Sequence, residues 1–331
     1  MFRSTSISGI SLDAAGLVAL ADLNTIAQRT AIVGSASLLD CLVLAPGIDR
    51  HQAASEINLG EQPATAALTT GYVFRVENQA TVRFLQRIGE TGKPITVKVS
   101  RESSKGIFSR YCLKGGILTS ILFLVSPFIT LVAIALMAVF QDWRGLGVIM
   151  VLIVARLINV IVIRRRSQPG WRGKLEPGEY GNLLVLVSQD RWIRIKGLVD
   201  DLKMVTSGQW LRNTTSREGF AVAFATLLVY ATAALAGNAS KNGSITILFL
   251  LLVSISLLGL SNEVTRSFHM HGCVLKVRGP AVVYVRRLEL AEELIKSSKR
   301  KDWALGLGMI RPEPSSKEGS VKDEAHVIPV L

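Results

Sequence analysis

Three side chains that can bind zinc alternate near the end of the chain: His269, His271 and Cys273. Because successive side chains of a strand point to opposite faces, a strand here would bring all three to one face. Zinc sites in proteins usually show clear ligand spacing, with four ligands in the structural type. No fourth ligand stands at a recognised spacing, so an ordinary strand is the favoured interpretation and no metal is predicted.

Two polar side chains interrupt a long apolar run: Arg156 and Asn159, which lie about one helical turn apart. An ionisable residue inside a membrane span is by default a functional hypothesis. Arg156 would lie about 10 Å of helix rise from the cytosolic end of its span, so its side chain could reach the lipid headgroups. We expect an intramembrane polar site with a structural or lipid-contacting role. Transport is the less favoured alternative, because no acidic residue lies in any apolar run.

A basic, tryptophan-bearing face is predicted in the middle of the chain. Residues 192–196 read as a strand, which places Trp192, Arg194 and Lys196 on one face. Such a face could contact anionic lipid. A solvated strand face is an equally good interpretation.

No catalytic framework is recognisable in the sequence. The motifs GxSxG, HExxH, Walker A and GxGxxG do not occur as part of one. The acidic pair Asp200–Asp201 lacks the second acidic cluster that membrane enzymes binding diphosphates through magnesium need. We therefore predict no catalytic residues, no enzyme activity and no cofactor.

Long apolar runs dominate the chain. Hydrophobic residues make up 49% of its 331 residues, and about 20 apolar residues in a row suffice to cross a bilayer. Short links join the runs in pairs, which predicts two antiparallel hairpins. The expected fold class is a membrane α-helical protein, with four transmembrane helices as two hairpins and a small α+β cytosolic domain. The four runs are 115–140, 145–163, 220–237 and 244–261.

The charge distribution predicts which side of the membrane each segment occupies. The net charge is +13, and positive residues beside spans mark the cytosolic face. In a four-pass arrangement every basic cluster falls on one side, so both termini and the central loop are expected to be cytosolic. The second tight turn, on the opposite side, carries candidate glycosylation sites at Asn238 and Asn242.

Six consecutive parts follow from these patterns. The stretch 11–44 is apolar but contains Arg29 and Asp40, so we interpret it as part of a soluble domain rather than a fifth span. The parts are a cytosolic N-terminal region (1–112), a first transmembrane hairpin (113–163), a cytosolic α+β loop (164–217), a second transmembrane hairpin (218–262), a cytosolic C-terminal region (263–310) and a disordered tail (311–331).

One segment carries a family resemblance. RWIRIKGLVDDLKMVTSGQWLR, residues 191–212, lies just before the third apolar run and resembles uncharacterised multi-pass membrane proteins of filamentous fungi. The resemblance covers the central loop and the adjoining spans, and it implies a fungal multi-pass membrane protein without indicating an activity.

The sequence as a whole predicts an integral membrane protein that anchors a cytosolic interaction module or lipid-contacting module. A small oligomeric transporter or channel is the alternative. The expected partners are membrane lipids and either a cytosolic protein or a second copy of the chain. Nucleic acid is not expected, because zinc-finger spacing, RGG segments and regular aromatic–basic interleaving are missing.

Overall fold

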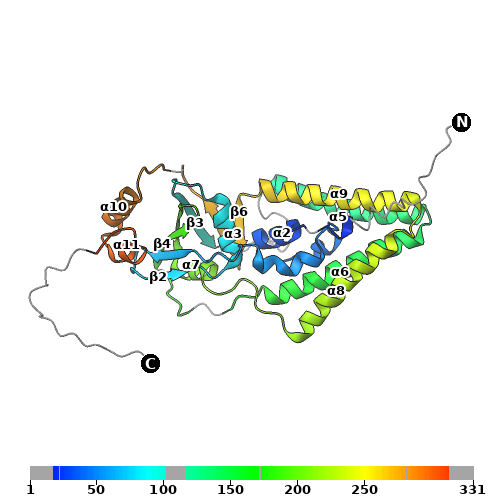
Figure 1. Cartoon of the computed structure of the whole chain (residues 1–331), viewed down its shortest axis with the longest axis horizontal. Coiled ribbons are helices and arrows are strands. Elements are labelled where there is room, and N and C mark those ends of the chain that lie inside the picture. The colour runs from blue at the N-terminus through cyan, green and yellow to red at the C-terminus, as the bar shows by residue number, and fades with distance from the viewer. Residues whose placement is uncertain (1–17, 22, 102–115, 171–172, 281, 313–331) are drawn as a thin grey trace, which may run out of the picture.

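The molecule is elongated, with long helices at one end and a sheet at the other (Figure 1). The computed structural model describes residues 18–21, 23–101, 116–170, 173–280 and 282–312. The predicted tail from residue 313 onward and the beginning of the N-terminal region lie outside the described residues.

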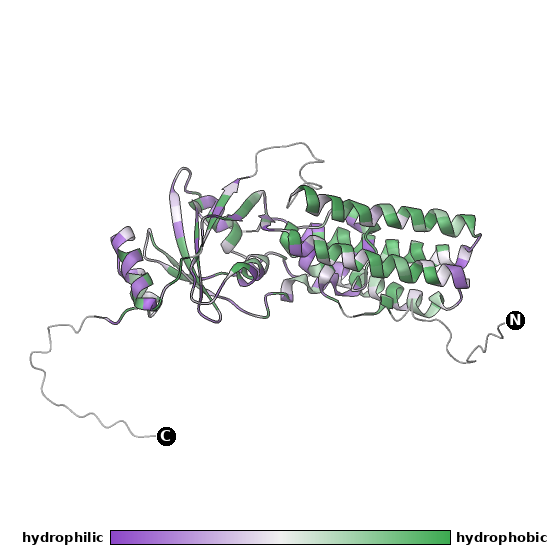
Figure 2. Ribbon diagram, turned by 90° about the horizontal axis from the view of Figure 1, so that it is seen from above, coloured by the Kyte–Doolittle hydropathy of each residue, from purple (hydrophilic) through white to green (hydrophobic). Residues whose placement is uncertain are grey.

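Four helices in the described part are long and apolar enough to cross a membrane, as the sequence predicted. Residues 140–142 join the first two, and residues 237–240 join the last two. Figure 2 shows apolar residues along most of their length, whereas the sheet end is mixed. The helices are α5 (Ile117–Val139), α6 (Trp143–Arg166), α8 (Ser216–Ala236) and α9 (Lys241–Val264).

The four helices pack most extensively as the pairs α5–α9 and α6–α8. The two pairs lie close together at the end with the short links and separate toward the sheet (Figure 1). Residues 23–57 fill the space between the separated pairs and contact all four helices. We call this segment the wedge. It contains the helix α2 (Thr25–Val33) and the 3-10 helices η1 (Leu38–Leu42) and η2 (Asp49–Glu56).

The position of the wedge corrects the expectation that this stretch belongs to a soluble domain. Val43, Leu44 and Ile48 are buried in one apolar cluster with Leu152 and Ala155 of α6. The wedge therefore packs largely against the long helices. Its short helices and scattered charges resemble those of a soluble domain, which is why local sequence pattern could not place it.

Seven strands form one sheet in the order β2-β1-β4-β5-β3-β7-β6. They come from the N-terminal region, the central loop and the C-terminal region, so three segments separated by long helices build a single sheet. β3 and β5 run parallel, and all other neighbours are antiparallel. The strands are β1 (Ala64–Ala67), β2 (Val73–Arg75), β3 (Ile95–Arg101), β4 (Tyr180–Val187), β5 (Arg191–Leu198), β6 (Ser267–Met270) and β7 (Cys273–Val277).

Helices cover both faces of the sheet. One face packs with α3 (Gln79–Ile88), which Asn78 caps by accepting a hydrogen bond from the Thr81 amide at 3.0 Å, and with α7 (Val199–Thr206). This core continues into α2 and the end of α6. The other face packs beneath α10 (Arg287–Ser298) and α11 (Asp302–Gly306). We call the sheet with these four helices the sheet region.

Candidate functional site

The irregular backbone of the wedge is held by polar side chains of the long helices. A buried carbonyl without a hydrogen-bond partner is costly, so non-helical backbone between apolar helices needs such donors. Thr130 donates to the Leu42 carbonyl at 2.7 Å, Asn159 donates to the Ile48 carbonyl at 3.3 Å, and Asn262 donates to the Thr25 carbonyl at 3.0 Å.

Arg156 points into the wedge and is only 2% exposed. Its Nε donates to the backbone carbonyl of Asp40 at 3.1 Å, and the Asp40 carboxylate attracts its charge. Its Nη1 has no hydrogen-bond partner among the residues that the structure describes. The wedge thus supplies an acidic residue near Arg156, which the apolar runs do not contain. Sequence reasoning missed it because the two residues lie 116 positions apart.

A second buried guanidinium is attracted to the same carboxylate. Arg29 is buried, its Nη1 donates to Ser261 Oγ at 3.4 Å, and its guanidinium lies 4.9 Å from the centroid of the Phe123 ring. Burial lowers the pKa of Arg29, and attraction to Asp40 partly opposes that effect. Two buried cations therefore face one aspartate inside the wedge.

His51 is fully buried between these charges. Its Nε2 lies 2.8 Å from Thr30 Oγ1, and that hydroxyl donates its own hydrogen to the Ile26 carbonyl at 2.9 Å. Both contacts are satisfied when the neutral ring carries its hydrogen on Nε2 and donates to this hydroxyl. Burial and the nearby charges of Arg156 and Arg166 lower the pKa of His51 well below its usual value.

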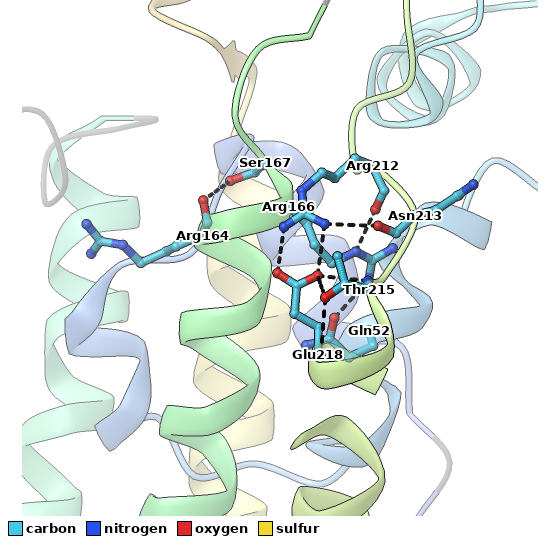
Figure 3. Close-up of polar contacts among 8 residues, drawn as sticks. All are labelled: Gln52, Arg164, Arg166, Ser167, Arg212, Asn213, Thr215 and Glu218. Atoms are coloured by element: carbon cyan, nitrogen blue, oxygen red, sulfur yellow. Dashed lines mark hydrogen bonds and ion pairs between the residues drawn. The ribbon is translucent and has the colours of Figure 1, made fainter. Parts of the chain in front are cut away.

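A chain of hydrogen bonds extends from Asn159 to the junction between the helices and the sheet region. Figure 3 shows its part from Gln52 onward. Gln52 donates to Asn159 Oδ1 at 3.0 Å, and Gln52 Oε1 accepts from Arg166 Nη1 at 2.8 Å. Arg166 Nε then donates to the Arg212 carbonyl at 2.8 Å. Of the predicted polar pair, Asn159 is thus one end of a longer network, whereas Arg156 bonds to the wedge at the Asp40 carbonyl.

The network ends at the start of α8. Arg212 donates two hydrogen bonds to the Glu218 carboxylate, at 2.8 and 2.6 Å. Glu218 also accepts from the Thr215 amide at 3.0 Å, and Thr215 Oγ1 accepts from the Glu218 amide at 3.4 Å, which completes a capping box. The first turn of α8 is therefore fixed to the segment that leaves the sheet.

The predicted lipid-facing strand face lies on the far side of the sheet from the long helices (Figure 1). Trp192 is 3% exposed, packs with Leu290 and Trp303, and donates from Nε1 to Asp190 Oδ1 at 2.7 Å. Arg194 Nε donates to Asn182 Oδ1 at 2.9 Å, and Lys196 is partly exposed. This corrects the interpretation of the indole as lipid-facing, because α10 and α11 cover it.

The alternating His269, His271 and Cys273 do not lie on a single strand. β6 ends at Met270, His271 occupies the turn with a φ of 48°, and β7 begins at Cys273. The expected strand is therefore a hairpin. Among the described residues, no group of three His, Cys, Asp or Glu side chains is placed to hold a metal ion.

At the opposite end of the molecule, Asp142 ties the two short links together. Its carboxylate accepts from the Gly145 amide at 2.9 Å and from the Ser240 amide and hydroxyl at 2.9 and 2.6 Å. Burial raises the pKa of Asp142, but these hydrogen bonds outweigh burial and bring its pKa below the usual value. Asn238 and Asn242 lie exposed beside this contact.

The described structure thus combines four apolar helices, a charged wedge between them and an α+β sheet region. No family model, no curated protein and no solved structure matches the chain. Chemically, the wedge can hold buried positive charge between the helices. The hydrogen-bond network can couple a movement of the wedge to a movement of the sheet region.

Proposed function

We propose that the protein is an integral membrane protein whose four long helices cross the bilayer as two hairpins. Large apolar side chains such as Ile117, Phe220 and Phe249 point outward from these helices, and a surface of this kind is stable in lipid rather than in water. The exposed Arg217 and Arg266 lie at the sheet end, which supports a cytosolic sheet region.

Within that arrangement, the protein anchors the sheet region as a rigid module for contact with membrane lipid or a cytosolic partner. The observation that carries this function is that the wedge packs against both the long helices and the sheet region. Ala27 and Ala31 of α2 belong to the core of the sheet region, and Trp210 Nε1 donates to the Gly34 carbonyl at 2.9 Å. Because the same short segment packs against both parts, the sheet region is held at a fixed distance from the membrane helices.

Labelling single introduced cysteines in sealed vesicles tests this orientation. Lys241→Cys changes the first residue of α9, directly after the link between α8 and α9, whereas Arg266→Cys lies at the sheet end. An impermeant thiol reagent should modify Arg266→Cys from the cytosolic side and Lys241→Cys only after the vesicles are opened. The unsubstituted chain, with its three native cysteines, measures the background. Equal labelling of both positions in sealed vesicles would contradict the four-pass topology.

Transport of a small anion is the second candidate. It is favoured by the buried Arg156, whose Nη1 has no partner in the described part of the chain and lies between helices that we place in the membrane. Purified protein in vesicles should then show anion flux that Arg156→Gln abolishes and that the exposed substitution Arg144→Gln leaves intact. Vesicles that stay silent with a broad panel of anions would eliminate this candidate.

A further inference from the structure

A surface groove lies beside the wedge, between η1 and the last turns of α6. Its volume is about 410 Å³, and its described lining combines two apolar side chains, two cationic side chains and one amide. The lining residues are Leu38, Ile161, Arg164, Arg165 and Gln168.

The backbone of η1 is fixed against the long helices, and this positions the apolar part of the groove beside them. Asp40 and Leu42 turn their carbonyls inward to Arg156 and Thr130. The outer side of η1 therefore presents Leu38, which is 55% exposed. Leu39 and Ile161 are also exposed. In the proposed orientation, these side chains face the acyl chains of the bilayer.

The cationic part of the groove lies one turn beyond Ile161. Residues three and four positions apart share a helix face, so Arg164 and Arg165 stand above that isoleucine. Neither arginine forms an ion pair within the described part of the chain. Figure 3 shows the Arg164 side chain pointing away from the cluster around Arg166 and Glu218.

The three consecutive arginines therefore differ in their surroundings. Arg166 is buried and donates to Gln52 and Arg212, so it is committed to the junction. Arg164 and Arg165 place two positive charges over an apolar surface, and none of the described residues that line the groove carries a carboxylate. A ligand that matches this surface needs a negative headgroup and a hydrocarbon chain.

We propose that this groove binds one anionic phospholipid, with its phosphate between Arg164 and Arg165, its headgroup near Gln168 and an acyl chain on Leu38 and Ile161. A zwitterionic lipid fits less well, because its ammonium group would lie beside two guanidinium groups. The inference rests on the proposed membrane insertion and names the lipid class that the anchored module contacts.

Native mass spectrometry of the detergent-purified full chain tests the site. We expect phosphatidylserine to bind with a Kd about ten-fold lower than phosphatidylcholine, since two arginines near a membrane surface favour anionic lipid. The double variant Arg164→Gln/Arg165→Gln should abolish this preference. The matched control Arg217→Gln/Arg266→Gln removes two exposed arginines from the same end of the helices and should keep it.

A second variant tests the apolar part without changing charge. Ile161→Trp fills the groove, so phosphatidylserine binding should fall while both arginines remain. Circular dichroism establishes that each variant is folded. Equal Kd values for the two lipids, an equal loss in the control variant, or displacement by inorganic phosphate alone would overturn the proposal. Resistance to alkaline extraction from membranes tests insertion separately, so an inserted protein without lipid preference contradicts only the groove.

Discussion

At the scale of single residues, the buried charges of the wedge determine how stability should respond to pH. The folded protein keeps His51 neutral because of burial and two nearby arginines. Below the ordinary histidine pKa of about 6.5, the unfolded chain binds a proton that the folded protein excludes. As the pH falls from this value toward the lower folded pKa, the unfolding free energy should decrease by up to about 1.4 kcal/mol per pH unit from this group.

Thermal unfolding of the protein in detergent between pH 7.5 and 5 measures this effect. A loss of about 1.4 kcal/mol of unfolding free energy per pH unit is large enough to detect. His51→Gln keeps an N–H donor for Thr30 but cannot titrate, so its stability should depend less on pH. Identical pH slopes in the two proteins would show that His51 does not control the acid sensitivity.

The shared carboxylate of Asp40 should be essential for stability. Asp40→Asn removes the negative charge that partly offsets the burial of Arg29 and Arg156, so it should destabilise the protein by about 1–3 kcal/mol. The exposed substitution Glu289→Gln removes the same charge and should change the melting temperature little. Arg156→Met added to Asp40→Asn should recover part of the loss, and failure to do so would indicate that Asp40 acts mainly through its hydrogen bond with Ser37.

At the scale of elements, the contact between the two short links should fix the helix pairs at that end. A Cβ added to Gly243 would lie 2.0 Å from Asp142 Oδ2. Gly243→Ala should therefore separate Asp142 from Ser240 and destabilise the protein by about 1–3 kcal/mol.

Gly147→Ala is the matched control, because nothing lies within 4 Å of a Cβ at that position of α6. Replacing this helical glycine should stabilise the helix slightly, by about 0.5–1 kcal/mol. Melting temperatures of the two variants in one detergent measure the difference. Equal melting temperatures of the two variants would mean that the short links accommodate the added methyl group without a loss of stability.

At the scale of the whole molecule, the coupling between the sheet region and the long helices should depend on Trp210. Trp210→Phe keeps an aromatic ring but removes the hydrogen bond to the Gly34 carbonyl, at a cost of about 1 kcal/mol. Limited proteolysis should then cut faster between β5 and α8. Trp192→Phe, which loses an indole hydrogen bond on the far face, should leave this cleavage unchanged, and equal acceleration in both variants would argue against a specific coupling.

The sequence by itself determined the four apolar helices, because their length and unbroken apolarity are local properties that survive any packing. It also indicated the strand at residues 192–196, since the alternation of side chains acts over a few residues. Arg156 and Asn159 were recognised as polar residues in an apolar run for the same reason.

Only the tertiary structure decided where these parts meet. The order of seven strands from three distant segments, the packing of α5 with α9, and the insertion of the wedge all depend on contacts between residues far apart in the chain. The wedge is the clearest case. Asp40 and Arg29 looked like solvated charges within residues 11–44, and only their burial beside Arg156 and Ser261 showed that the partners they need lie on α6 and α9, more than 100 positions away.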